Sequence, residues 1–344
     1  MKLKRIHFLL WHKILFLLTA SIVILALGLG FVTWRSLRQA SQQIRLDGDE
    51  VLSKQTETFL EKLVKGQAVA LDLQLAQART AVSYGATFLE KHLHPESGKL
   101  PDATLLKSVL PGLMKNASNT TMIYFASRSG ELWIFPEGES DAKGTVNLTR
   151  ESFFPQMADF ERAPGDVLWS QIHASPLSLH YEMVVDAISP VMADGNIRGY
   201  VGISLSLTRL IAQFSQHQPI RGGYSFLTGT GYHLIAAPPH ARIELSPPGR
   251  YVPRGMIDLG NSDDFEFTAT LRDMILGGTF VKKMANKGKP TYLACHPLDQ
   301  INWHLGLMVP VTMATAASAQ LLEVIESGTH RALLEMLISQ SEKR

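Results

Sequence analysis

Residues 169–210 constrain the fold of this chain more than any other stretch. Two runs with strand character, residues 181–192 and 197–207, are joined by a short segment that contains Asp194-Gly195. Asp-Gly between such runs predicts a β-hairpin, because glycine readily adopts the positive φ that a tight turn requires. The second run alternates polar or small residues with apolar ones, which is typical of a strand with one face in a core. We predict an antiparallel sheet whose other face, carrying Ser204, is open to a ligand.

Residues 14–34 contain no charged side chain. A helix rises about 1.5 Å per residue, so this run matches a hydrocarbon core of about 30 Å. Lys2, Lys4, Arg5 and Lys13 precede it, which by the positive-inside rule places residues 1–13 in the cytoplasm. A cleavable signal peptide is the competing interpretation, but no small-x-small cleavage site ends the run. We predict a single-pass anchor in the cytoplasmic membrane, with the rest of the chain outside the cytoplasm.

Residues 35–94 lack proline and are rich in good helix formers, which predicts one long helix ending before Pro95. Its apolar positions recur at a helical period and indicate a packing face, either for its own domain or for a dimer partner. The predicted stripe is Phe59, Leu63, Gln67, Ala70, Leu73, Gln77 and Ala81, widened by Leu60, Val64, Leu71, Leu75 and Ala78.

A strand–turn–strand pattern over residues 122–135 recurs over residues 223–236. Such recurrence predicts two similar sheet domains in tandem. The second is completed by a predicted helix at 264–277 and by strands at 279–284, 291–296 and 303–309, with a turn at Lys287-Gly288. Residues 314–340 carry Glu323, Arg331 and other charges, so they predict an amphipathic rather than a membrane-spanning helix.

Composition and motifs exclude several functional classes. The net charge is only +2 and charged residues make up 19%, which does not indicate nucleic-acid binding. Cys295 is the only cysteine, so no intramolecular disulfide is possible. The sequence contains no His-Glu-x-x-His, Gly-x-Ser-x-Gly or Cys-x-x-Cys motif. We therefore predict no enzyme activity, no catalytic residue, no metal site and no cofactor.

The order of these segments resembles the double-Cache family, the paired PAS-like extracytoplasmic sensor domains of bacterial receptors. The matching residues are 169–170 (WS), 186–191 (DAISPV), 194–195 (DG), 199–205 (GYVGISL), 223–227 (GYSFL), Gly231 with 234–238 (LIAAP), and 303–306 (WHLG) with 309–310 (VP). The match covers most of residues 36–312. The resemblance implies an α+β fold with a transmembrane helix, a long helix, two tandem antiparallel sheet domains and a C-terminal amphipathic helix.

The implied domain boundaries follow the pattern of the sequence. They are 1–13 for the cytoplasmic N-terminus, 14–34 for the membrane helix, 35–94 for the long helix, 95–219 for the membrane-distal sheet domain, 220–312 for the membrane-proximal one and 313–344 for the amphipathic helix.

In this family the distal domain usually holds the ligand, between its sheet and a loop that in the amino-acid-binding branch reads Arg-x-Trp-Tyr. The matching loop here is 150–154 (RESFF), and Tyr181 stands where the family has a tyrosine on the next strand. Ser204 occupies the position of the aspartate on the last strand. A carboxylate is needed there to balance a ligand's ammonium group, so this departure argues against an α-amino acid.

The candidate ligand-binding residues are Tyr124, Arg150, Phe153, Phe154, Trp169, Tyr181, Asp186 and Ser204. A guanidinium group offers paired donors that match a carboxylate, so Arg150 indicates an organic acid as the ligand. Each residue also has a structural interpretation: the aromatics as core, Arg150 as a surface charge, and Tyr124 and Asp186 as parts of the sheet.

The sequence therefore predicts a membrane-anchored sensor module that binds a small molecule and forms a homodimer through its long N-terminal helix. In the family, a second membrane helix and a cytoplasmic output domain normally follow the sensor, whereas here the amphipathic helix comes next. Either the module signals through a partner protein, or it is the front piece of a split or truncated receptor. The alternative function is an envelope protein-interaction module with no small-molecule ligand.

Overall fold

The computed structural model describes residues 35, 50–92, 101–115, 117–136, 147–162, 166–176, 182–216, 220–229, 231–246, 257–318 and 320. The chain divides into two units, Met1–Thr56 and Glu57–Arg344. The predicted membrane helix at 14–34 and most of the predicted C-terminal helix lie outside the described residues. Among the residues described, no helix combines the length and the apolar character needed to cross a membrane.

The structure describes a long helix over residues 50–92, and its residues from Glu57 onward belong to the second unit. Its buried side chains recur every three or four residues, as one face of an α-helix requires. They are Leu60, Val64, Ala68, Leu71, Leu75, Ala78, Ala81, Val82, Ala86 and Leu89. Leu73, which the sequence placed in the packing stripe, is instead 60% exposed. The buried face is therefore centred on the residues that were predicted only to widen the stripe.

The first sheet is antiparallel and has the strand order β2-β1-β6-β5-β3, with β4 also pairing with β5. Its elements and those that cover it are α2 (Ala103–Met114), β1 (Thr120–Ser127), β2 (Leu132–Phe135), η2 (Leu148–Arg150), α3 (Met157–Arg162), β3 (Leu168–Trp169), β4 (His173–Ala174), β5 (Met183–Ala193) and β6 (Asn196–Ser206). The predicted hairpin is confirmed: it joins β5 to β6, with Asp194 at φ 51° and Gly195 at φ 74°.

The two faces of β6 do not divide as the sequence suggested. Val201, Ile203 and Leu205 belong to a core, as predicted, and this core includes the long helix. The opposite face was predicted to be open, yet Tyr200 and Ser204 are only 5% and 2% exposed. Side chains from the segment around η2 and α3 form a second core with residues of β1, β5 and β6, and this core covers that face.

The second sheet is also antiparallel and has the order β10-β11-β12-β7-β8-β9. Its elements are α4 (Leu207–Gln216), β7 (Tyr224–Gly229), β8 (His233–Ala236), α5 (Pro239–Leu245), β9 (Ile257–Asp258), η3 (Leu259–Asn261), α6 (Phe265–Ile275), β10 (Phe280–Asn286), β11 (Lys289–Pro297) and β12 (Trp303–Pro310). The predicted helix is α6, capped by the Asp264 side chain, and the predicted Lys287-Gly288 turn has both residues at positive φ. The two predicted sheet domains are thus confirmed.

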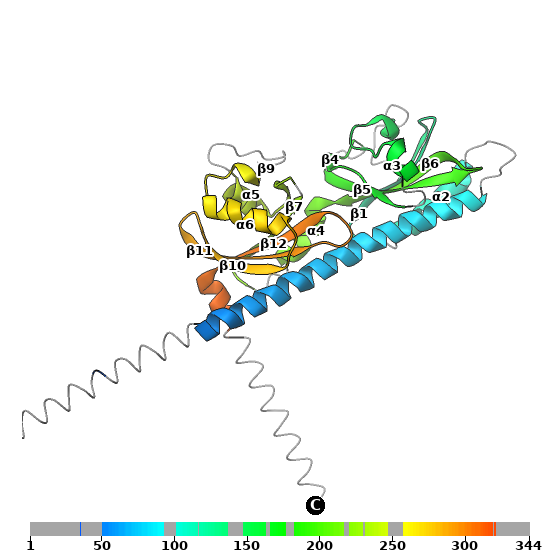
Figure 1. Ribbon diagram of the computed structural model, residues 1–344. Helices are drawn as coiled ribbons and strands as arrows, with labels where there is room; N and C mark the ends of the chain where they lie inside the picture. Colours follow the sequence, from blue (N-terminus) through cyan, green and yellow to red (C-terminus); the bar gives the residue numbers. More distant parts are fainter. Residues whose placement is uncertain are drawn as a thin grey trace, which may run out of the picture. The chain divides into compact units, whose positions relative to one another are not determined.

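One helix supports both sheets. Figure 1 shows the first and second sheets lying along the same long blue-to-cyan helix, and one continuous core joins its buried residues to Val201 of the first sheet and Leu305 of the second. Polar contacts reinforce the packing, because the Ser225 hydroxyl of β7 donates to Gln67 of the helix at 2.9 Å.

Candidate functional site

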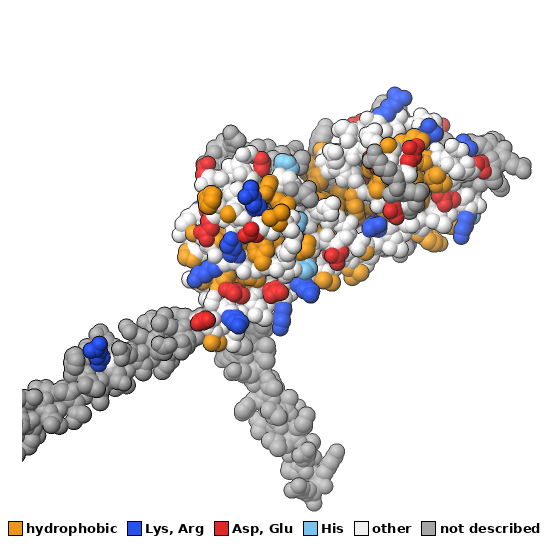
Figure 2. All heavy atoms as spheres, in the orientation of Figure 1, with side chains coloured by type: hydrophobic (Ala, Val, Ile, Leu, Met, Phe, Trp, Pro, Cys, Tyr) orange, Lys and Arg blue, Asp and Glu red, His pale blue; other side chains and the backbone are white. Residues whose placement is uncertain are grey.

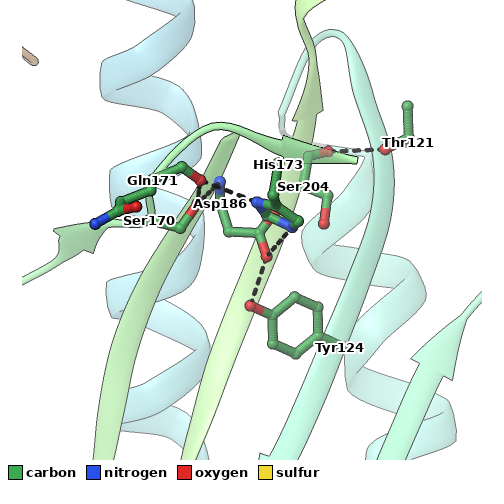
Figure 3. A network of polar contacts seen from close by, with 7 residues as sticks. All are labelled: Thr121, Tyr124, Ser170, Gln171, His173, Asp186 and Ser204. Atoms are coloured by element: carbon green, nitrogen blue, oxygen red, sulfur yellow. Dashed lines mark hydrogen bonds and ion pairs between the residues drawn. The ribbon is translucent and has the colours of Figure 1, made fainter. Parts of the chain in front are cut away.

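The centre of the candidate site is the Asp186 carboxylate on β5. Asp186 pairs in register with Ser204 on β6, and Tyr124 reaches it from β1, one strand further. A Cβ built on Gly202 would overlap the Tyr124 ring, so only glycine lets that ring lie flat across β6. In this position the Tyr124 hydroxyl donates to Asp186 Oδ2 at 2.9 Å, as Figure 3 shows.

The backbone of Asp186 is held by Ser170, which follows β3. The Ser170 amide donates to the Asp186 carbonyl, and the Asp186 amide donates to the Ser170 hydroxyl oxygen, each at 2.8 Å. The Ser170 hydroxyl in turn donates to the Gln171 carbonyl at 2.9 Å. Three contacts therefore fix the residues around the carboxylate before any ligand is considered.

His173 on β4 lies on the other side of the carboxylate from Tyr124 (Figure 3). Its Nε2 is 3.9 Å from Asp186 Oδ2, and its Nδ1 is 2.9 Å from the Gln171 carbonyl oxygen. A carbonyl only accepts, so Nδ1 carries a proton and Nε2 is the nitrogen that faces Asp186. The Phe153 ring stacks on the imidazole with centroids 3.5 Å apart and planes inclined by 3°.

Burial dominates the electrostatics of the site. Asp186 is 2% exposed, and the removal of its carboxylate from water raises its pKa. The His173 ring and the hydroxyls of Ser204 and Tyr124 act in the opposite direction and are smaller influences. Burial, together with the neighbouring Asp186 charge, also raises the pKa of Tyr124 well above its usual value. Asp186 Oδ1 has no hydrogen-bond partner among the described residues.

The structure brings together four of the eight candidate residues. Tyr124, Asp186 and Ser204 meet on the sheet, and Phe153 covers them through His173. Thr121 adds a hydroxyl that donates to the Ser204 carbonyl at 3.2 Å.

No hydrogen bond or ion pair with Asp186 is described for the other four candidates. Arg150 ends η2 and is exposed. Trp169 packs on the core that includes the long helix. Phe154 is buried against the rings of Tyr200 and Phe160. Tyr181 lies outside the described residues.

Two residues of the site, Ser170 as a backbone clamp and His173, were not among the sequence candidates. Both lie on or beside strands of two residues, β3 and β4. A strand this short has no hydrophobic periodicity, so the sequence carries no signal for where its side chains point.

Known structures share this fold along about three quarters of the chain. The ligand-binding domain of the Pseudomonas fluorescens chemoreceptor CtaA, solved with L-isoleucine, has a TM-score of 0.55 and 15% identity, covering 78% of this chain and 97% of that one. The periplasmic sensory domain of the Campylobacter jejuni chemoreceptor Tlp1 has a TM-score of 0.58 and 11% identity, covering 76% and 98%. The ligand-binding domain of Pseudomonas aeruginosa PctC, solved with GABA, has a TM-score of 0.52 and 16% identity, covering 74% and 99%.

No protein-family model and no curated protein sequence matches the chain at a significant level. The likeness therefore rests on three-dimensional structure: two six-stranded antiparallel sheets on one long helix. The described part of this chain has the fold of the periplasmic ligand-binding domains of bacterial chemoreceptors.

Proposed function

We propose that this chain is an extracytoplasmic sensor domain, anchored by residues 14–34, that binds a small molecule carrying an ammonium group. It acts by binding rather than by catalysis. The observation that carries the proposal is the buried Asp186 carboxylate, one oxygen of which has no partner among the described residues.

A carboxylate in this environment favours a cation. A buried charge is costly unless it is paired and hydrogen-bonded, and the raised pKa of Asp186 reflects that cost. An ammonium group brings both a positive charge and several N–H donors to an acceptor such as Oδ1. The ligands in the CtaA and PctC structures, L-isoleucine and GABA, both carry an ammonium group.

The organic acid expected from Arg150 receives less support. Arg150 is exposed at the end of η2, and no contact of its side chain with the Asp186 group is described. An anion placed beside Asp186 would instead meet a like charge. We propose that Asp186, the cross-strand neighbour of Ser204, takes the role of the aspartate that the family has at the Ser204 position.

We also propose that two copies associate through the long helix. Val69, Leu73 and Tyr84 are 57%, 60% and 64% exposed on its outer side. Figure 2 shows hydrophobic side chains along the edge where this helix lies in Figure 1. Leu73→Glu is expected to turn a dimer into a monomer in light scattering of the full chain. A wild-type chain that is monomeric at high concentration would refute this assembly.

Thermal unfolding of the purified full chain tests the binding proposal with pairs of ligands that differ in the ammonium group. L-alanine is compared with L-lactate, and γ-aminobutyrate with butyrate. A ligand at 100 times its dissociation constant stabilises the folded state by about 2.7 kcal/mol. We expect stabilisation by L-alanine, by γ-aminobutyrate or by both. We expect none from L-lactate or butyrate, which lack the ammonium group.

Asp186→Asn is expected to abolish this stabilisation, because it removes the charge that attracts the ammonium group. Asp194→Asn is the matched control: it makes the same chemical change in the exposed β5–β6 turn, where the side chain forms a surface ion pair with Arg198. Stabilisation by L-lactate or butyrate alone would overturn the proposed ligand class. No response to a broad panel of amines would favour the protein-interaction alternative.

A further inference from the structure

The Trp169 indole makes a hydrogen bond between the two sheets. Its Nε1 donates to the Gln300 carbonyl at 2.9 Å, and Gln300 lies in the turn between β11 and β12. The ring is partly buried and packs on the shared core. Trp169 was predicted to line the binding site, but in the structure its polar group points to the second sheet.

Gln300 contacts the long helix as well. The Asp72 carboxylate accepts hydrogen bonds from the backbone amides of Asp299 and Gln300, both at 3.1 Å. The guanidinium Nη1 of Arg79 donates to the Gln300 side-chain oxygen at 3.4 Å. One turn therefore uses its amides, a carbonyl and a side chain to join the first sheet, the second sheet and the helix.

The same stretch of chain that reaches Gln300 also holds the candidate binding residue. Ser170 follows Trp169 directly and exchanges two hydrogen bonds with the backbone of Asp186. Trp169 is the last residue of β3, and Ser170 follows it. This strand has two residues, which pair with Ala187 and Ile188 of β5. So short a strand has few contacts of its own to keep it in place when Asp186 shifts.

We infer that the Trp169–Gln300 hydrogen bond couples the Asp186 site to the β11–β12 turn and, through Asp72, to the long helix. A change of charge or hydrogen bonding at Asp186 shifts residues 169–170, and the indole carries that shift to Gln300. The turn then changes how firmly its two amides are held by Asp72. Trp169 is a positioning residue in this scheme. The inference rests on the proposed function only in taking Asp186 as the residue that responds to ligand.

Hydrogen exchange in the full chain tests the coupling without any ligand. The measured quantity is the exchange rate of the Asp299 and Gln300 amides. Asp186→Asn serves as the perturbation, because it neutralises the carboxylate as a bound cation would. Trp169→Phe keeps an aromatic ring and removes only the N–H donor. Trp133→Phe is the matched control, since the Trp133 ring packs on the same core, beside Phe125.

In the wild-type and Trp133→Phe backgrounds, Asp186→Asn is expected to change exchange at these amides by about fivefold, the factor that one hydrogen bond contributes. In the Trp169→Phe background the same substitution is expected to leave the rates unchanged. Asp72→Asn is expected to speed exchange in every background, which verifies that these amides report on Asp72.

Two results would overturn the inference. An equal response to Asp186→Asn with and without the indole donor would show that coupling follows another route. No response in any background that retains a folded chain would show that the turn does not sense the site. Neither result depends on whether L-alanine or γ-aminobutyrate binds, so failure here is distinct from failure of the proposed function.

Discussion

The two sheets have the same strand order, yet they differ in what they bury. Read from β8, the second sheet runs β8-β7-β12-β11-β10, which corresponds to β2-β1-β6-β5-β3 of the first, and β9 adds a further strand beyond β8. In both sheets an aromatic ring on the first strand crosses a glycine on the last: Tyr124 over Gly202, and Phe226 over Gly306. This shared pair sets a common register for comparing the two.

Two residues beyond that glycine, the two sheets carry different residue pairs. The first sheet places Ser204 opposite Asp186, whereas the second places Met308 opposite Leu293. The crossing ring differs as well, because Phe226 lacks the hydroxyl with which Tyr124 reaches Asp186. The same framework thus supports a polar group in one sheet and a filled apolar core in the other. Whether this position holds a polar group is a property of a few side chains and not of the fold.

The largest effect is expected from giving the second sheet the charge of the first. Leu293→Asp would bury a carboxylate at 0% exposure among Phe226, Met284 and Met308, which offer no matching donors. The expected loss of stability is more than about 4 kcal/mol, measured by urea unfolding at pH 7. A stable Leu293→Asp chain would show that the second sheet can also hold a polar group, and the contrast would fail.

A smaller effect is expected at the shared glycines. Gly202→Ala and Gly306→Ala each place a methyl group in the space of a buried ring and should cost about 1–3 kcal/mol. Only Gly202→Ala should also weaken ligand binding, because it moves the Tyr124 hydroxyl from Asp186. Gly66→Ala on the long helix is the control, since no atom lies within 4 Å of the added Cβ. It should stabilise the chain by about 0.5–1 kcal/mol. Equal binding losses from Gly202→Ala and Gly306→Ala would contradict the assignment.

The smallest effect concerns the pH dependence of stability. Burial raises the Asp186 pKa, so the folded state keeps its proton to a higher pH than the unfolded state, where the pKa is about 3.9. At pH values between these two pKa values, the folded state binds more protons than the unfolded state. The free energy of unfolding therefore falls as pH rises through this range. Asp186→Asn should therefore be more stable than the wild type at pH 7, and the gain should vanish towards pH 3. Denaturant midpoints across this range measure it, and a destabilised variant at pH 7 would contradict it.

Local signals made much of the fold predictable. Asp194-Gly195 and Lys287-Gly288 specify tight turns, and Asp264 caps α6 through a side-chain bond to the Phe267 amide. Each of these features depends on residues within a few positions in the sequence. The strand alternation around Val201 also identified the buried face of β6, which in the structure meets the long helix.

The site depended on information that the sequence does not show. Beside the turn, Ala193 pairs with Asn196, and counting outward from that pair would place Val185 opposite Ser204. A bulge at Val191/Met192 shifts the register by one residue and brings Asp186 to that position instead. Because a shift of one residue exchanges the two faces of a strand, the sequence could name Asp186 as a candidate but could not place it opposite Ser204.

The single helix beneath both sheets has a consequence for how this chain can be divided. Residues 57–344 form one unit, although the connection near residue 220 looks like a domain boundary by topology. A fragment cut there would carry the second sheet without Leu60, Val64 and Ala68, which help to complete the shared core. The two sheets share a strand order, but each depends on the same helix to complete its core. We expect neither sheet to keep its core if it is transplanted alone, so a chimaeric protein built from this chain must carry the helix with whichever sheet it keeps.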